Sequence, residues 1–150
     1  MRIFIWKLKE FLRSCFAVMV ILLCGAVLLL ANVSRFPFLS GERVFYLNSA
    51  SSQGLRSQKI ELSQIFDAKG ESVCISVSDE TQAQAVVAEV FDRLRAEVLL
   101  TERACGVTSY YGYTAEFADG IYIEGMKINL HVAVCGNRLI VGSPIIFDGF

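Results

Sequence analysis

Few residues in this sequence could carry out chemistry, and the first of them is the single histidine, His131. A Ser-His-Asp triad would have to use it. No serine stands in a G-x-S-x-G string, however, and the string Gly142-Ser143-Pro144 lacks the strand-to-helix elbow that presents a nucleophile. We therefore expect no catalytic constellation, and we interpret His131 as a strand histidine that donates a hydrogen bond at the sheet surface.

Cysteines do not complete a metal site around His131. Cys135 follows four residues later, about 13 Å along a strand, which is too far for both to bind one zinc. Cys74, Cys105 and Cys135 are an odd number of thiols outside the N-terminal apolar segment, so the sequence allows one disulfide without indicating which two would pair. No G-x-G-x-x-G or Walker string is present. We expect neither a metal nor a cofactor.

Three tyrosines in one short run form the most suggestive surface. Strand alternation places Tyr111 and Tyr113 on one face together with Ser109, as stacking residues of a glycan-binding platform would be. Strands are rich in tyrosine in any case, so ordinary cross-strand packing is the alternative interpretation. The candidate binding residues are Tyr110, Tyr111, Tyr113 and His131.

The element most clearly predicted lies at the N-terminus. Residues 14–34 are 21 consecutive residues without a charge, and 11 of them are Leu, Ile, Val or Phe. As a helix they would cover roughly 30 Å, the hydrocarbon thickness of a bilayer. Their insertion would be favoured by roughly 3–7 kcal/mol. The sequence therefore predicts a transmembrane helix, with the lipid bilayer as its partner.

Charge predicts the orientation of this helix. The flank 1–13 carries Arg2, Lys7, Lys9 and Arg13, whereas only Arg35 and Arg43 lie close on the other side. The positive-inside rule then places residues 1–13 in the cytoplasm and residues 41–150 outside it, with 35–40 as a short connector. Because no A-x-A-like cleavage site is present, we expect an uncleaved signal anchor, with a cleaved signal peptide as the alternative.

The remaining chain, residues 41–150, is acidic. It holds nine basic and 14 acidic residues, a net charge of about −5, against about +4 for residues 1–40. An acidic domain on the far side of a membrane would repel nucleic acid and would not meet it. We therefore expect no nucleic-acid partner.

Periodicity predicts an α+β domain of two layers, an antiparallel sheet with one amphipathic helix on one face. The helix follows Asp79, whose spacing to Gln82 is that of a capping box, and runs for about four turns. Ser63 is expected to cap a single turn that Lys69-Gly70 closes. The expected strands cover residues 43–47, 56–62, 73–78, 97–102, 107–114, 121–123, 126–128, 128–135 and 138–142.

Four stretches of the C-terminal half carry a resemblance to a known family. They are 71–96, Val107-Thr108-Ser109-Tyr110-Tyr111, Lys127-Ile128-Asn129-Leu130-His131-Val132-Ala133 and Val141-Gly142-Ser143-Pro144-Ile145. These stretches resemble the YwmB family, extracytoplasmic proteins of spore-forming Firmicutes with a fold like that of the TATA-box-binding protein. The resemblance covers residues 71–150 and includes no catalytic motif. It implies a curved sheet with a helix and a role at the cell envelope or in sporulation, without an assigned activity.

Three functions follow as hypotheses. The first is a membrane-anchored extracytoplasmic interaction module, with an envelope protein as its partner. The second is a glycan-binding or enzymatic domain that uses the surface from Tyr110 to Thr114. The third is a structural subunit that assembles through its sheet edges. The sequence does not indicate an oligomeric state.

Overall fold

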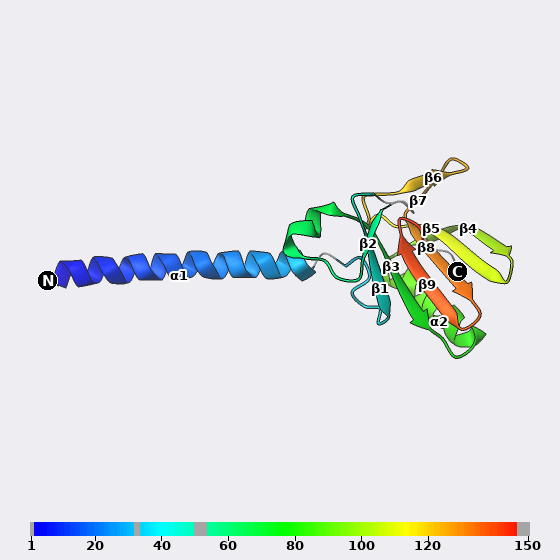
Figure 1. Cartoon of the computed structure of the whole chain (residues 1–150), viewed down its shortest axis with the longest axis horizontal. Coiled ribbons are helices and arrows are strands. Elements are labelled where there is room, and N and C mark those ends of the chain that lie inside the picture. The colour runs from blue at the N-terminus through cyan, green and yellow to red at the C-terminus, as the bar shows by residue number, and fades with distance from the viewer. Residues whose placement is uncertain (1, 32–33, 50–53, 147–150) are drawn as a thin grey trace. The chain divides into compact units, whose positions relative to one another are not determined.

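The computed structural model describes residues 2–31, 34–49 and 54–146, and it divides the chain into two compact units (Figure 1). The boundary falls between Val33 and Ser34. The first unit contains helix α1 (Arg2–Ala31), and the second contains helix α2 (Glu80–Arg93) and all the strands.

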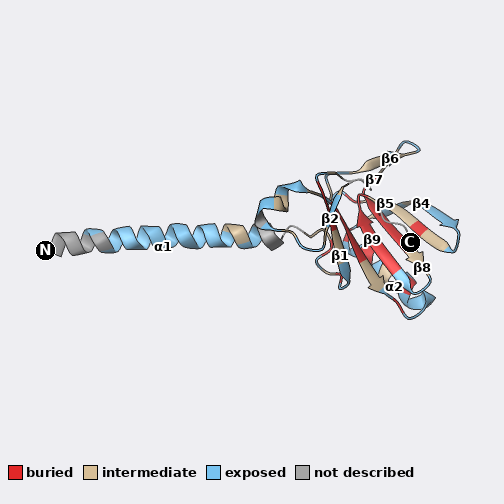
Figure 2. Ribbon diagram, viewed as in Figure 1, coloured by how far each residue is buried: buried red, intermediate tan, exposed pale blue. Residues whose placement is uncertain are grey.

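Helix α1 is long, apolar and exposed. Its stretch Lys9–Leu28 has a mean hydropathy of 2.4, and none of those 20 residues is buried. Leu22 and Ile21, for example, are 68% and 69% exposed, and Figure 2 shows most of the helix in the colour of exposed residues. An apolar surface this large needs a membrane or a partner to cover it. The N-terminal apolar helix predicted from sequence is thus confirmed, and it is consistent with either a signal anchor or a signal peptide. Its described part runs to Ala31, and residues 32 and 33 of the predicted span lie outside the described residues.

The second unit is built on a seven-stranded sheet in which every neighbouring pair is antiparallel. The strand order is β2-β1-β3-β9-β8-β5-β4. The strands are β1 (Glu42–Leu47), β2 (Leu55–Ser57), β3 (Ala68–Ser76), β4 (Glu97–Ala104), β5 (Val107–Tyr113), β8 (Leu130–Cys135) and β9 (Arg138–Ser143). A separate two-stranded ribbon consists of β6 (Ile121–Ile123) and β7 (Met126–Ile128). Glu124 and Gly125 join its strands at φ 49° and 80°, as a tight hairpin turn requires.

Helix α2 covers one face of the sheet. Asp79 caps it, accepting a hydrogen bond from the Gln82 amide at 2.8 Å, and this bond is the main cause of the lowered pKa of Asp79. Its apolar face belongs to the same buried core as the central strands (Figure 2). That core includes Ala83, Val87, Val90 and Phe91 of α2 and Val73, Val132, Leu139 and Val141 of the sheet. The predicted α+β class, with one helix on one face of an antiparallel sheet, is therefore confirmed.

The chain between β1 and α2 differs from the prediction. The strand expected over 56–62 is only Leu55–Ser57, and the turn expected after Ser63 is a 3₁₀ helix, η1 (Leu62–Asp67), capped by Glu61. Strand β3 begins at Ala68 instead of Val73, so Gly70 lies inside a strand and does not end a helix. A Cβ on Gly70 would come within 2.9 Å of the Ser143 carbonyl oxygen, which explains a glycine at this point of the sheet.

A second difference lies at Asn129. The single strand expected over 128–135 is interrupted there, with β7 ending at Ile128 and β8 beginning at Leu130. The buried Asn129 amide accepts from the Thr114 backbone N–H at 2.8 Å and donates to the carbonyls of Thr114 and Phe117 at 2.7 and 2.9 Å. The Asn129 backbone N–H also donates to the Gly112 carbonyl at 3.0 Å, so both its backbone and its side chain hold the chain at this interruption.

The segment expected to be a connector is part of the folded domain. Phe36 is fully buried, Leu39 is 7% exposed, and both belong to the main core. The Phe36 ring meets the Phe117 ring edge-on, with centroids 5.8 Å apart. The domain therefore begins at Ser34, seven residues before the predicted boundary at Gly41.

Candidate functional site

His131 lies in β8 on the face of the sheet opposite α2, and it is only 4% exposed. Its Nδ1 accepts a hydrogen bond from the Ile146 backbone N–H at 3.3 Å, so the ring proton is on Nε2. Among the described residues Nε2 has no partner. Burial lowers the pKa of His131 to about 4, which keeps the ring neutral at physiological pH. The prediction of a donating histidine at the sheet surface was therefore wrong.

The chain after β9 accounts for this burial. Beyond Pro144 it returns over the sheet, and Ile146 packs on Ala133 and Ile140. A Cβ on Gly142 would lie 2.7 Å from Cγ1 of Ile146, so the close approach requires a glycine in β9. His131 lies beneath this C-terminal strap, residues 143–146, where it has no free access to a substrate.

Tyr111 stacks on His131. The two residues are directly paired across β5 and β8, and their ring centroids are 4.3 Å apart with planes inclined by 18°. The Tyr111 hydroxyl donates to the Glu102 carboxylate at 3.4 Å, at the long end of hydrogen bonding. Burial, with a further contribution from the negative charge of Glu102, raises the pKa of Tyr111. The pair forms a rigid aromatic unit on the face opposite α2.

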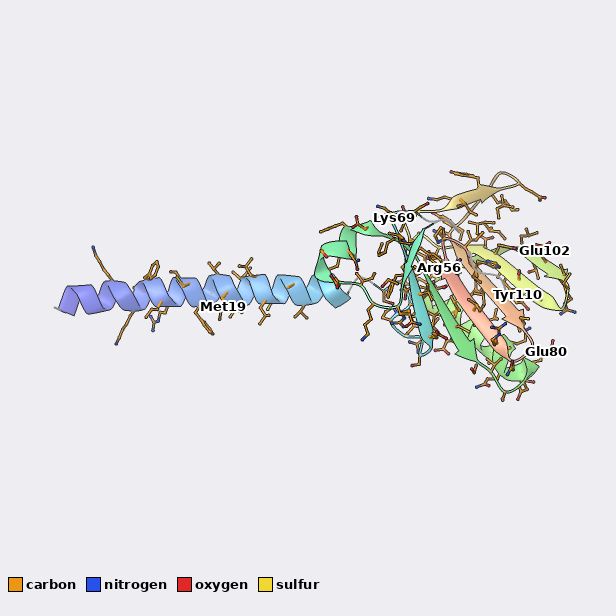
Figure 3. All side chains as sticks on the ribbon, in the orientation of Figure 1. Met19, Arg56, Lys69, Glu80, Glu102 and Tyr110 are labelled. Atoms are coloured by element: carbon orange, nitrogen blue, oxygen red, sulfur yellow. The ribbon has the colours of Figure 1, made fainter. Side chains whose placement is uncertain are left out.

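The three tyrosines do not form one surface. Tyr110, which is labelled in Figure 3, contacts α2 on the other side of the sheet, where its hydroxyl and the Gln84 side chain bond at 3.0–3.2 Å. Tyr113 shares the face of Tyr111, as predicted, but the Lys127 ammonium lies 5.7 Å above its ring centroid. The tyrosines are thus in contact with protein groups, as the packing interpretation expects, and they leave no continuous aromatic platform in the described part of the chain.

A group of residues that the sequence did not single out surrounds Glu71 of β3. Its carboxylate is 1% exposed and accepts hydrogen bonds from the Ser34 hydroxyl at 2.8 Å and from the Arg35 backbone N–H. Nε of Arg43 lies 3.2 Å away, an ion pair without an aligned hydrogen bond. Burial raises the pKa of Glu71, and these bonds and charges partly oppose the rise.

The two arginines extend this group, which we call the entry clamp (Ser34, Arg35, Arg43 and Glu71). Nη2 of Arg43 donates to the carbonyls of Phe36 and Leu39 at 3.0 and 2.7 Å. Arg35 donates to the Ser143 hydroxyl at 2.8 Å and pairs with Asp119 at 2.9 Å. The clamp therefore fixes the first residues of the domain to β3, to the end of β9 and to the loop before β6. Ser34 and Glu71 lie 37 residues apart in sequence, and Arg35 lies 108 residues from the Ser143 hydroxyl that it contacts, so no local pattern could have revealed the clamp.

All five cysteines are free thiols. Cys74 and Cys135 are half-buried in strands, and Cys105 is exposed in the turn between β4 and β5. The disulfide that the sequence allowed is not formed in this structure. Over the described residues, no three His, Cys, Asp or Glu side chains lie close enough to hold a metal ion.

The exposed edge of the sheet at β4 carries features that oppose strand pairing between molecules. Glu97, Glu102 and Arg103 are exposed on it, and the register shifts between Val98 and Leu100. Charges and bulges of this kind are common devices that protect sheet edges. The edge therefore gives no support to assembly through β4.

Comparisons of this chain with protein-family models, with curated proteins and with solved structures found no match.

Proposed function

We propose that this protein is a single-pass membrane protein, in which α1 is an uncleaved signal anchor and the α+β domain is an extracytoplasmic interaction module. The observation that carries the proposal is the apolar surface of α1, because no residue of Lys9–Leu28 is buried in the structure. A lipid bilayer would cover that surface. The basic flank 1–13 supports a cytoplasmic N-terminus.

We infer that the partner of this module lies in or near the membrane, such as an envelope protein, because an uncleaved α1 would anchor the domain there. The resemblance of residues 71–150 to the YwmB family agrees with this location.

Cys105 provides a built-in reporter of topology. It is exposed and lies in the domain, so a maleimide that cannot cross membranes should label it in intact cells. The control is Glu10→Cys in a Cys105→Ser background, because that thiol lies in the cytoplasmic flank and should react only after lysis. The reverse pattern would overturn the orientation. Recovery of a shortened chain in the soluble fraction would show that α1 is a cleaved signal peptide.

The interaction role is tested separately. The full chain, and a variant whose residues 14–31 are replaced by an unrelated apolar span, are used to capture partners from detergent extracts. A shared envelope protein that binds both would show that the domain provides the interaction. If neither recovers such a protein, the interaction role is wrong even where the topology is confirmed.

A further inference from the structure

A hollow of about 580 Å³ lies at the end of the sheet next to the β6–β7 ribbon. Lys69 at the start of β3 and Lys127 of β7 line it, with Asn48, Asp119, Gly120 and Tyr122 among the other lining residues. Together with Pro144, these residues bring four distant parts of the chain around one hollow. Its volume is in the range of small-molecule sites.

The two lysines have unused hydrogen-bonding capacity. The Lys127 ammonium donates to the Ala118 carbonyl at 3.0 Å, and that of Lys69 donates to the Phe66 carbonyl at 3.4 Å. An ammonium has three donors, so each lysine retains two. Within the described ranges neither lysine pairs with a carboxylate.

Among the described residues, one acid lines the hollow, and it already has a partner. The Asp119 carboxylate pairs with Arg35 at 2.9 Å, and the same guanidinium donates to the Lys69 carbonyl at 3.3 Å. Among the described lining residues, Lys69 and Lys127 are therefore two positive charges against the one negative charge of Asp119, which Arg35 already neutralises. This local balance is positive, although residues 41–150 as a whole are acidic.

Lys127 is held in place. A Cβ on Gly120 would come within 2.9 Å of the Lys127 Cε, so the absence of a side chain at Gly120 makes room for the lysine stem. The Tyr113 ring lies 5.7 Å from the ammonium, within the range of a cation–π contact. These contacts restrict the ammonium before any ligand binds, which lowers the entropic cost of binding.

We propose that this hollow binds a phosphate group that carries an organic substituent. A phosphate offers three or more acceptor oxygens and can bridge two ammonium groups, which are common phosphate ligands. The volume leaves room for the substituent, beside the exposed Tyr122 ring. The same chemistry is present in a phospholipid headgroup and in a soluble phosphate ester. The site lies entirely within the domain and does not depend on the orientation of α1.

The test uses the full chain in dodecyl maltoside micelles, which contain no phosphate. The backbone amide resonances of Gly120 and Tyr122 are followed by NMR during titration with glycerol 3-phosphate, with sodium chloride at matched ionic strength as the control. A second arm adds phosphatidylglycerol to the micelles, with diacylglycerol as the phosphate-free control lipid. We expect saturable shifts with at least one phosphate source and none with either control.

Variants assign the shifts to the hollow. Lys69→Gln and Lys127→Gln should each weaken binding about tenfold, because each removes one charge-assisted contact. Lys59→Gln is the matched control, since Lys59 is an exposed lysine outside the hollow. Shifts with glycerol 3-phosphate alone assign a soluble ligand, and shifts with phosphatidylglycerol alone assign a lipid headgroup. The proposal is overturned if neither source produces a saturable shift, or if Lys59→Gln weakens binding as much as the other two variants.

Discussion

Glu71 and His131 are both buried ionisable groups in the same domain, but their surroundings are opposite. Glu71 is surrounded by donors and cations from the chain entry, whereas His131 has one hydrogen bond and one stacked ring, and its Nε2 lacks a partner among the described residues. Glu71 thus organises a network, and His131 fills space beneath the C-terminal strap. We therefore expect removal of the Glu71 side chain to lower the free energy of unfolding, and we expect His131 to lower it chiefly when its ring is protonated.

The two groups also act on pH-dependent stability in opposite directions. The pKa of Glu71 is raised above 4.5, so its contribution is fully present below pH 4.5 and is lost as pH rises through the folded pKa. The pKa of His131 falls from 6.5 to about 4, so its contribution is present above pH 6.5 and is lost as pH falls towards 4. As pH rises above 4.5, the free energy of unfolding therefore decreases through Glu71 and increases through His131, and these two changes partly cancel.

The largest effect is expected from Glu71→Ala. It leaves Arg43 and the amide of Arg35 without their buried partner, and breaking a buried ion pair from one side costs about 3–5 kcal/mol. The measurement is the free energy of unfolding of the full chain in detergent, by chemical denaturation. Glu89→Ala is the control, because Glu89 is exposed and its ion pair is with Arg93 on the same helix. If the two variants lose equal stability, the entry clamp does not hold the domain together.

The next effect is the pH dependence that His131 imposes. A pKa lowered from 6.5 to about 4 corresponds to about 3 kcal/mol, lost between pH 6.5 and 4. His131→Phe retains a ring against Tyr111 and cannot be protonated, so its unfolding free energy should fall less across this interval. Denaturation curves at a series of pH values test this expectation. Parallel pH profiles for the parent chain and the variant would show that His131 does not control the slope.

A smaller effect is expected from Gly142→Ala. The new Cβ would overlap Ile146, which must shift, and overpacking of this kind costs about 1–3 kcal/mol. A displaced strap would also expose His131, so the imidazole pKa should rise towards 6.5, as measured from its NMR titration. Gly25→Ala in α1 is the control, because its added Cβ meets nothing within 4 Å. An unchanged imidazole pKa would mean that the strap does not cause the burial.

The elements that the sequence predicted well are those with a local signal. The Asp79 cap and the amphipathic helix that follows it were predicted correctly. Capping and turn chemistry act over a few residues and leave a readable pattern. In contrast, the start of β3 at Ala68 was not predicted, because the run Lys69-Gly70-Glu71 resembles an exposed turn in the sequence. Glu71 is buried there by partners from residues 34–43, which no local pattern indicates.

The candidate site shows the same limit. Strand alternation already separates Tyr110 from Tyr111 and Tyr113, so the absence of a single tyrosine surface follows from a pattern visible in the sequence. The burial of His131 could not be predicted from such a pattern, because it depends on the path of residues 143–146 back over the sheet. Alternation assigns a residue to a face of the sheet, but it does not say whether another segment covers that face.

The smallest effect concerns the ring stack itself. Tyr111→Leu keeps an apolar side chain on β5 but removes the stacking on His131, and aromatic pairs contribute about 0.5–1.5 kcal/mol beyond the area they bury. The control is Tyr122→Leu, because Tyr122 is 74% exposed and its ring should add little stability. Tyr111→Leu should lower the unfolding free energy in the parent chain and should lower it less when Gly142→Ala is also present, because a displaced strap already loosens His131. Additive losses in this double-mutant cycle would show that the stack and the strap stabilise the domain independently.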